Sequence, residues 1–348
     1  GWILGPLVHI GTQGMGQYSP AVAYNPDDDE FMVVWADWRT GSYDVWGQRV
    51  NAANGSLHPE FQINTDPDWQ WYPAIAYNPD AGQYLVAWSD RRDDPGDGSN
   101  YNAYGRRLYA DGSSIDADDF VISAREYNQE NVAVAYNPVQ RQYLVVWNEG
   151  SSAGLRIAGQ RVRDSKPGYL EGPNFDICTA TGDQVKPSVA CNTAAGEYLV
   201  VWQDRRSVST HDVYGRRVSG TGALLGAGDI AISTASQNQT DPHASYDPSR
   251  DRYFVCWADS RAADTAPDIY GQALDASGEL LFTTAGENAP VWVYPREQEY
   301  PVAAGDPVDG RAMVVWQDKR NGVSSNVYGR VGTPKDYLNY LPLVLYGD

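Results

Sequence analysis

Six tryptophans recur along this 348-residue chain at intervals of 53 to 59 residues, each inside a copy of one longer pattern. The pattern that the copies share, with departures in single copies, reads Gln-x-x-Pro, then Tyr-Asn-Pro, then Tyr-Leu-Val-Val-Trp-x-Asp-x-Arg, then Val-Tyr-Gly-Gln-Arg, with variable gaps between these segments. The tryptophans are Trp35, Trp88, Trp147, Trp202, Trp257 and Trp316. Self-similarity at this period indicates a repeat architecture and leaves no room for a separate domain. Residues that recur in every copy are expected to serve the scaffold rather than chemistry.

The first repeat contains four segments typical of β-strands. Residues 20–24 alternate small and larger side chains before an Asn-Pro turn, and residues 31–35 form a continuous apolar run of strand length. Residues 44–50 and 61–65 supply a third and a fourth strand, and no segment has helical periodicity. Four antiparallel strands in a repeat of about 55 residues predict a propeller blade. The chain is therefore predicted to be an all-β, six-bladed β-propeller.

The order of the strands predicts how the blades pack. The first strand carries small residues such as Ala21 and Ala23, which suit the crowded axis, while the apolar second strand suits burial between blades with its tryptophan filling the gap. The sixth repeat lacks a fourth strand, and residues 7–12 align with residues 61–65. We expect this N-terminal strand to complete the last blade and close the ring. The predicted domains are a propeller, residues 1–331, and an apolar tail, residues 332–348.

The chain is strongly acidic, with 26 Lys and Arg against 45 Asp and Glu and a formal net charge of −19. This charge argues against nucleic acid and against anionic membrane surfaces as partners. No run approaches the roughly 18 apolar residues of a membrane helix. The chain starts with Gly1 and contains 24 Tyr and 12 Trp but only 3 Met. These features lead us to expect a mature, secreted, extracellular or cell-surface protein.

The repeats with Tyr-Asn-Pro and Tyr-Leu-Val-Val-Trp resemble those of secreted bacterial six-bladed β-propellers, over roughly residues 5–331. The segment of residues 340–345 is similar to C-terminal stretches of some secreted bacterial proteins. Neither resemblance implies a known reaction.

A glutamine precedes the first strand of every repeat, and these glutamines are the first candidate ligand-binding set. Six amides around an axis suit a polar ligand, a sugar or an ion. Each can equally hydrogen-bond the backbone of a neighbouring blade, which is the interpretation we favour. These residues are Gln17, Gln70, Gln129, Gln184, Gln239 and Gln298.

An aspartate and an arginine two residues apart follow five of the six tryptophans. Glycoside hydrolysis needs two carboxylates about 5–9 Å apart, and five equivalent residues around a ring give no privileged pair. We therefore interpret them as structural ion pairs that hold loops. The pairs are Asp37/Arg39, Asp90/Arg92, Asp204/Arg206, Asp259/Arg261 and Asp318/Arg320.

The third repeat departs from the pattern, because Trp147 is followed by Asn-Glu-Gly-Ser without the aspartate or the arginine. Residues 150–154 match Gly-x-Ser-x-Gly, but a nucleophile elbow needs a strand–turn–helix context that is not predicted here. Broken symmetry marks either a functional blade or one that has drifted.

No cofactor or metal is expected. The histidines lie in non-equivalent positions without ligand spacing, and the acidic run of residues 27–30 lacks a calcium-loop pattern. The three cysteines, Cys178, Cys191 and Cys256, replace ordinary strand residues and are predicted to be unpaired.

The apolar tail is the last candidate. It either packs on its own propeller or docks on another subunit, and strand addition between copies would produce an oligomer or a filament. Its apolar residues are Tyr337, Leu338, Tyr340, Leu341, Leu343, Val344 and Leu345.

Two functions from different classes remain. Without an asymmetric acid–base constellation, we expect a non-catalytic extracellular structural protein that assembles with itself through the tail. The alternative is a carbohydrate-binding or carbohydrate-active propeller that uses the Gln/Asp/Arg face and binds surface glycans.

Overall fold

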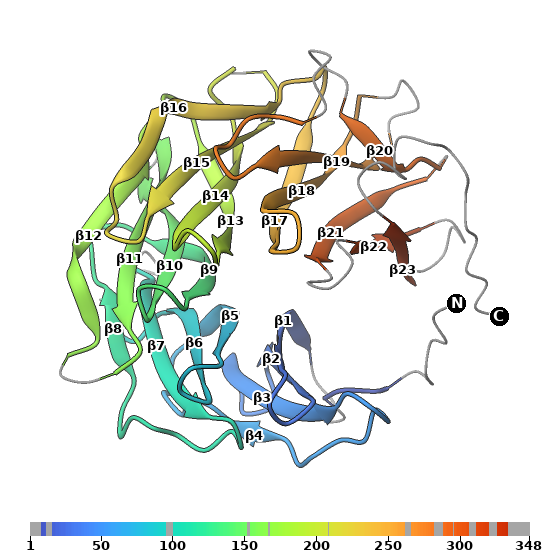
Figure 1. The fold of residues 1–348 in the computed structure, drawn as a ribbon. Coiled ribbons are helices and arrows are strands. Elements are labelled where there is room, and N and C mark those ends of the chain that lie inside the picture. Colours follow the sequence, from blue (N-terminus) through green and yellow to red (C-terminus); the bar gives the residue numbers. More distant parts are fainter. Residues whose placement is uncertain are drawn as a thin grey trace. The chain divides into compact units, whose positions relative to one another are not determined.

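The computed structural model describes residues 8–11, 16–94, 100–151, 154–165, 168–207, 209–261, 266–281, 288–294, 296–305, 311–319 and 326–332. Within these residues the protein is all-β, as predicted, and its sheets are antiparallel blades in the arrangement of a six-bladed propeller (Figure 1). No helix in the described residues is long and apolar enough to span a membrane. The chain forms two compact units, one of residues 1–153 and 158–175 and the other of residues 154–157 and 176–348.

The first three blades are four-stranded. Blade 1 comprises β1 (Gln17–Asn25), β2 (Glu30–Asp37), β3 (Asp44–Asn51) and β4 (Phe61–Gln62). Blade 2 comprises β5 (Gln70–Asn78), β6 (Gln83–Asp90), β7 (Asn102–Tyr109) and β8 (Phe120–Ser123). Blade 3 comprises β9 (Gln129–Asn137), β10 (Gln142–Ser151), β11 (Gly154–Arg163) and β12 (Leu170–Cys178).

The next three blades repeat this order. Blade 4 comprises β13 (Gln184–Asn192), β14 (Glu197–Asp204), β15 (Asp212–Ser219) and β16 (Leu224–Ser233). Blade 5 comprises β17 (Gln239–Asp247), β18 (Arg252–Asp259), β19 (Asp268–Asp275) and β20 (Ala289–Trp292). Blade 6 has three described strands, β21 (Gln298–Gly305), β22 (Ala312–Asp318) and β23 (Asn326–Gly332).

The strand that we expect to complete blade 6 lies at the edge of the described residues. Residues 1–7 are outside them, and residues 8–11 are described without strand structure. The backbone N–H of Gly11 donates to the side-chain oxygen of Gln48 in blade 1, at 3.4 Å. The pairing of residues 7–11 with β23 therefore stays a prediction. Of the predicted tail, residues 332–348, the structure describes only Gly332, at the end of β23, and the seven candidate residues lie outside the described part of the chain.

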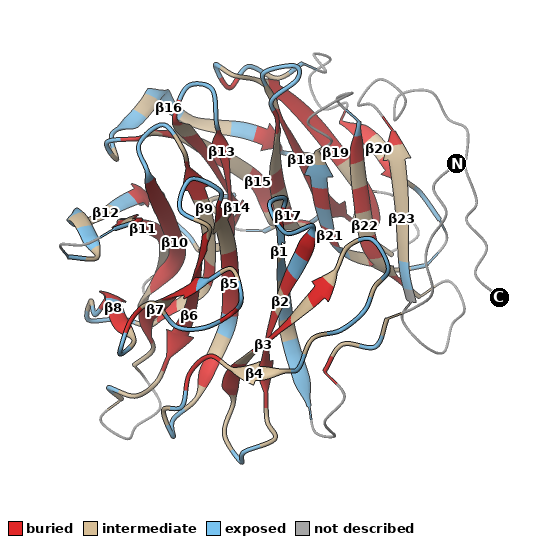
Figure 2. Cartoon of the chain, turned by 60° about the horizontal axis from the view of Figure 1, so that its bottom comes forward, coloured by how far each residue is buried: buried red, intermediate tan, exposed pale blue. Residues whose placement is uncertain are grey.

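The second strand of each blade carries the core, as its continuous apolar run predicts. Every residue of β6 is buried, and Figure 2 shows the same along most of β10. The repeat tryptophan packs with residues of the preceding blade: Trp88 shares a cluster with Val34 and Ile63 of blade 1, and Trp147 shares one with Leu85 of blade 2. The prediction that the tryptophans fill the space between blades is confirmed for these two.

A glycine in the third strand lets the outer strand approach. A Cβ added to Gly105 would lie 2.9 Å from the Cδ1 atom of Ile122 in β8 and 3.2 Å from the backbone oxygen of Val86 in β6. A larger residue would have to displace these neighbours. This repeat position therefore sets how closely the outer strand packs onto the blade.

Each first strand contains a β-bulge near its start. The register with the second strand shifts after the second residue of β1, β5, β9, β13, β17 and β21. The residue two positions after the glutamine has a φ between 51° and 54° in all six blades, although it is never glycine. These residues, which we call the bulge residues, are Ser19, Tyr72, Asn131, Lys186, Asp241 and Tyr300. A non-glycine residue with such a φ is strained, and strained positions concentrate at functional sites.

Candidate functional site

The glutamine of each first strand pairs with the carboxylate residue near the end of the second strand, for example Gln70 with Asp90 and Gln184 with Asp204. We call this the glutamine end of a blade. Because all six blades share this register, the predicted glutamines and carboxylates lie at equivalent ends of their blades. The bulge residues lie at the same end. Residues that differ between blades there are the candidates for function.

The glutamine side chains are engaged by the loops that lead into their strands. Gln70 donates its amide to the carbonyl of Asp68 at 2.5 Å, and Gln239 donates to that of Gln237 at 2.9 Å. The same contact, to the carbonyl two residues earlier, is made by Gln129, Gln184 and Gln298.

Five of the six glutamines are fully buried. The exception is Gln17, which donates to the carbonyl of Gly11 and to the carboxylate of Asp37. We expected the glutamines to bond to the backbone of a neighbouring blade, but the five buried amides bond to the connection just before their own strand. They fix that connection and do not present a ring of amides to solvent.

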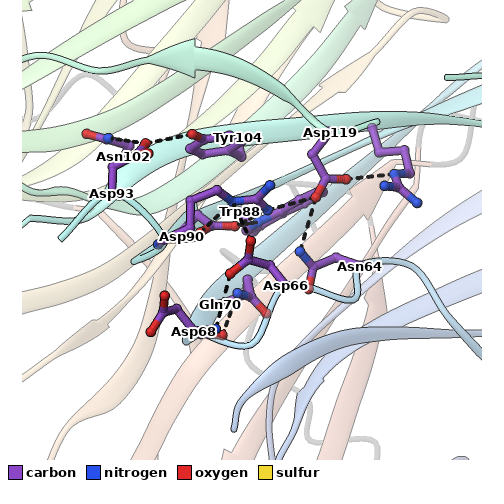
Figure 3. Close-up of polar contacts among 12 residues, drawn as sticks. Asn64, Asp66, Asp68, Gln70, Trp88, Asp90, Asp93, Asn102, Tyr104 and Asp119 are labelled. Atoms are coloured by element: carbon purple, nitrogen blue, oxygen red, sulfur yellow. Dashed lines mark hydrogen bonds and ion pairs between the residues drawn. The ribbon is translucent and has the colours of Figure 1, made fainter. Parts of the chain in front are cut away.

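The second-strand carboxylates are held by the tryptophan and arginine of the repeat, an arrangement that we call the clamp. The indole N–H of every repeat tryptophan donates to the carboxylate two residues later, over 2.7–3.2 Å. In four blades the following arginine adds an ion pair at 2.6–2.7 Å. Figure 3 shows this arrangement around Trp88 and Asp90 in blade 2. Arg320, the remaining predicted arginine, lies outside the described residues.

The arginine of the clamp also reaches the outer and third strands of its blade. Arg92 bonds to Asp119, just before β8, at 2.7 Å, and its guanidinium lies 4.2 Å from the ring centre of Tyr104 in β7. Arg206 in blade 4 repeats both contacts, with Asp229 at 2.8 Å and Tyr214 at 3.8 Å. One side chain thus ties three strands together at the glutamine end.

Blade 5 departs from the simple ion pair that we predicted for its arginine. Arg261 binds Asp259 at 2.6 Å and lies 4.1 Å from the ring centre of Tyr270, as its counterparts do. Its contact toward the outer strand, however, is the neutral amide oxygen of Asn288, at 2.9 Å, where Arg92 and Arg206 meet a carboxylate. Arg261 also donates to the hydroxyl of Ser233 in blade 4, at 3.2 Å. This arginine therefore links two blades, whereas we predicted only its pair with Asp259.

Blade 3 carries the same clamp with different residues, which corrects our interpretation that it lacks one. Glu149 takes the place of the aspartate and accepts from Trp147 at 2.7 Å. Arg125, from the loop before β9, takes the place of the arginine and donates to Glu149 at 2.6 Å. Sequence comparison missed this because the arginine comes from a different segment. Blade 3 therefore contains a complete clamp.

The clamp influences the protonation of these carboxylates. Burial acts to raise the pKa of Asp37, but hydrogen bonds from Arg39, Trp35 and Gln17 outweigh it and hold that pKa below its usual range. In blade 2 burial is the stronger effect, and it raises the pKa of Asp90 despite Arg92. All six carboxylates are fully buried. Their burial and their clamp contacts indicate that they stabilise the scaffold.

Glu130, at the bulge of β9, is different. Its side chain is partly buried, and it has no hydrogen-bond or ion-pair partner among the described residues. Burial raises its pKa above the usual glutamate range. The neighbouring bulge residue Asn131 donates to Asn148 at 2.9 Å. A carboxyl group whose pKa is raised keeps its proton to higher pH than usual, which is the property that a general acid needs.

Tyr101 connects Glu130 to the third strand of blade 2. The backbone oxygen of Tyr101 accepts from the N–H of Gln129 at 2.7 Å, which places the start of β7 beside the start of β9. Burial first, and then the nearby charges of Glu130 and Tyr72, act to raise the pKa of Tyr101, while Arg91 acts to lower it. Glu130, Tyr101 and Tyr72 therefore lie close enough to interact electrostatically.

Six aromatic side chains gather at the glutamine end of blades 1 and 2, and we call this set the aromatic platform. Its ring centres form a connected series with separations of 3.8–6.1 Å. Two of its members are substantially exposed, Tyr18 at 49% and Tyr72 at 39%. The platform consists of Tyr18, Trp38, Tyr43, Trp69, Trp71 and Tyr72. Sequence reasoning missed it because these residues are not part of the repeat.

Two of the three bulge residues of blades 4, 5 and 6 carry charge. Lys186 forms an ion pair with Asp241 at 2.5 Å, and its ammonium lies 5.8 Å from the ring centre of Tyr300. These side chains come from the first strands of blades 4, 5 and 6. The six bulge positions thus share one backbone conformation but carry different side chains. The clamp, in contrast, uses the same side chains in most blades.

The other sequence candidates fall elsewhere. The three cysteines are free and buried. The Gly-x-Ser-x-Gly match falls where β10 ends and β11 begins, so it joins two strands and has no following helix; its central Ser152 lies outside the described residues. In the acidic run, the N–H groups of Asp27 and Asp28 donate to the side chain of Asn25, which makes a local turn.

Comparison with known proteins finds likeness only in structure. No family model matches the chain, and no curated protein does. An α-L-arabinanase of Penicillium chrysogenum in complex with arabinobiose superposes with a TM-score of 0.60 at 15% identity, over 92% of this chain and 94% of that one. A leech intramolecular trans-sialidase superposes with a TM-score of 0.62 at 8% identity, over 97% of this chain and 71% of that one.

A Hadza microbial sialidase, Hz136, gives a TM-score of 0.60 at 9% identity and covers 92% of this chain, which spans 66% of the sialidase. At these identities the likeness establishes the fold. The likeness also overturns our main functional expectation of a non-catalytic structural protein, because the similar structures named here are an arabinanase, a trans-sialidase and a sialidase. The interpretation as a non-catalytic filament or oligomer was wrong, and the carbohydrate alternative is the better supported one.

Proposed function

We propose that this protein is a carbohydrate-active propeller that binds a glycan at the glutamine end of blades 1–3 and cleaves a glycosidic bond with Glu130 as the proton donor. The observation that carries the proposal is the state of Glu130. It is a partly buried carboxyl group without a hydrogen-bond or ion-pair partner among the described residues, and its pKa is raised by burial. The second-strand carboxylates of blades 2 and 3 are instead bound by a tryptophan and an arginine.

The chemistry of glycoside hydrolysis requires such a group. The leaving oxygen must receive a proton as its bond to the anomeric carbon breaks, and water supplies the oxygen that bonds to that carbon. The acid therefore has to be protonated at the working pH. Desolvation favours this by disfavouring the charged form of the carboxyl group. The bulge beside Glu130 recurs in all six blades, but only in blade 3 does it place a glutamate without a hydrogen-bond or ion-pair partner among the described residues beside Tyr101.

The likeness to solved structures supports the same class of substrate. The arabinanase structure contains arabinobiose, and the leech enzyme is complexed with 2,7-anhydro-Neu5Ac. Surface glycans are accordingly the partners that we propose, and an extracellular location is part of the proposal. The acidic charge of the chain does not suit nucleic acid.

Hydrolysis of a panel of oligosaccharides, measured as released reducing sugar, tests the proposal. Glu130→Gln keeps the shape of the side chain but cannot donate a carboxylic proton, so we expect kcat to fall by about 10²–10⁴-fold. The control is Glu126→Gln, four residues earlier at an exposed position of the preceding loop, which should keep full activity. Full activity in Glu130→Gln would exclude Glu130 as the acid.

A second function, glycan binding without cleavage, is favoured by one observation. Glycoside hydrolysis uses two carboxylates, and in blades 1–3 the second-strand carboxylates are all held in clamps. If the wild-type protein binds an oligosaccharide but releases no product over a long incubation, this second function replaces the first.

A further inference from the structure

We infer that the ligand of this site is a neutral oligosaccharide whose sugar rings pack on the aromatic platform, and that acidic sugars are excluded. This inference rests on the proposed function and names its substrate class. It depends on three features of the platform, which are its absence from the repeat, its indole N–H groups without a partner among the described residues, and the charge around it.

The aromatic platform is not part of the repeated scaffold. Trp69 directly precedes the blade 2 glutamine, and a residue needed to build a blade would recur there, as the six clamp tryptophans do. The residues at the same position of the next four blades are Asn128, Asp183, Asn238 and Glu297. The platform therefore serves a role specific to blades 1 and 2. Its centre is formed by Trp71 and Tyr43, whose ring centres are 3.8 Å apart.

The platform tryptophans differ from the clamp tryptophans in their hydrogen bonds. Each clamp tryptophan donates its indole N–H to a buried carboxylate, whereas the indoles of Trp38, Trp69 and Trp71 have no hydrogen-bond partner among the described residues. None of these three N–H groups is among the buried unpaired atoms of the described residues, and each of the three side chains is partly exposed. An aromatic face beside indole N–H donors matches a sugar ring, which presents C–H groups on its face and hydroxyl groups at its edge.

The charge around the platform decides between neutral and acidic sugars. Residues 1–150 contain 8 arginines and no lysine, but 21 aspartates and glutamates. All eight arginines lie in ion pairs with carboxylates. Those at the glutamine end of blades 1 and 2 are bound at 2.6 Å; they are Arg39, Arg91 and Arg92.

A carboxylated sugar needs an available cation, and arginine is the residue that binds carboxylates in a two-point fashion. Using one of these arginines would leave its present carboxylate without that partner, which is unfavourable for a buried group such as Asp90. Glu130 adds further repulsion when it is ionised. The site therefore favours a neutral glycan, even though the similar structures include a sialidase and a trans-sialidase.

Binding titration with the full-length Glu130→Gln protein tests the inference without turnover. The probes are neutral oligosaccharides of arabinose, xylose and glucose, together with sialyllactose and oligogalacturonate as acidic probes. We expect at least one neutral probe to bind and to change the tryptophan fluorescence. Trp71→Ala should weaken that binding by about tenfold or more, as expected for the loss of a stacked aromatic ring.

Two further variants test the role of the platform, one at a second platform residue and one as a control away from it. Tyr18→Ala removes an exposed platform ring and should also weaken binding, even if Trp71→Ala does not fold. Tyr109→Ala is the matched control, because Tyr109 is 52% exposed but lies at the opposite end of blade 2. The affinity of this control should stay within about twofold of the parent.

The outcomes separate this inference from the proposed function. Equal or tighter binding of an acidic probe, or unchanged affinity in both platform variants, overturns the inference while the proposed function stands. If none of the probes binds, the inference is also overturned, and hydrolysis by the wild-type protein then decides the proposed function separately.

Discussion

Arg125 donates a 2.6 Å hydrogen bond to the fully buried carboxylate of Glu149, 24 residues further along the chain. In blade 2 the cation instead follows the carboxylate by two residues, as Arg92 follows Asp90. Blade 3 thus satisfies the same physical requirement, a buried carboxylate needing a positive partner, from the opposite side in sequence. A positive partner for the buried carboxylate is therefore present in blade 3, although the Trp-x-Asp-x-Arg pattern is absent there.

Removing this cation should destabilise the protein. Arg125→Ala leaves Glu149 buried without its arginine, and we expect a loss of about 2–4 kcal/mol in the free energy of unfolding. Urea denaturation measures it. The matched control is Arg141→Ala, whose side chain is 62% exposed in its ion pair with Asp164 and should cost less than about 1 kcal/mol. Equal effects of the two changes would contradict the proposed role of the clamp.

The second prediction concerns His243 in β17. Burial lowers the pKa of this histidine from 6.5 to about 4, and its Nδ1 atom accepts from the N–H of Ala303 at 3.2 Å. Because the folded-state pKa is depressed, the unfolded chain takes up a proton first as the pH falls. Stability should therefore be lost between about pH 6.5 and 4, with a slope that approaches about 1.4 kcal/mol per pH unit from this group.

His243→Asn separates this contribution from that of other groups. The asparagine oxygen can accept from Ala303 in place of Nδ1 but does not titrate. Denaturation at several pH values between about 6.5 and 4 should show a smaller decline for the variant than for the wild type. Parallel curves for the two proteins would rule out His243 as a source of the pH dependence.

The third prediction concerns the thiols. Burial raises the pKa of Cys178 and of Cys191 to about 12, and it raises the pKa of Cys256 as well. The thiolate is the reactive form, so the folded protein should react only slowly with a thiol reagent at about pH 8. In denaturant all three cysteines should titrate. A smaller number of thiols under those conditions would reveal a disulfide or another modification.

The fourth prediction tests the packing of the outer strand. Gly105→Ala places a Cβ atom 2.9 Å from Ile122, so we expect a loss of about 1–3 kcal/mol in the free energy of unfolding. Gly228→Ala serves as the control, because the nearest atom to its added Cβ is the end of Arg216 at 3.9 Å. The stability of this control should change by no more than about 0.5 kcal/mol. Thermal or urea denaturation of both variants gives the comparison.

Much of the fold could be predicted because the same pattern of strands occurs in six repeats. The predicted strands of the first repeat, residues 20–24, 31–35, 44–50 and 61–65, correspond to β1, β2, β3 and β4, although β4 covers only Phe61–Gln62. The aspartate and arginine after the tryptophan were also assigned to structure from their repetition. Sequence spacing could not reveal that the arginine reaches the outer strand, since the loop between them varies in length. For the same reason it could not show that Arg261 meets an amide of Asn288 where other blades offer a carboxylate.

The sequence by itself determined the number of blades, because the repeat occurs six times. It also determined the buried second strand and the spacing of the clamp, because both follow from residue patterns within a single repeat. Only the tertiary structure decided which side chains meet at the glutamine end. Tyr43 and Trp71 come from two blades, as do Tyr101 and Glu130, so their proximity depends on how neighbouring blades pack. Residues outside the repeat do not recur at equivalent positions, so the sequence does not identify them as a group. They form a common surface only because neighbouring blades pack against one another.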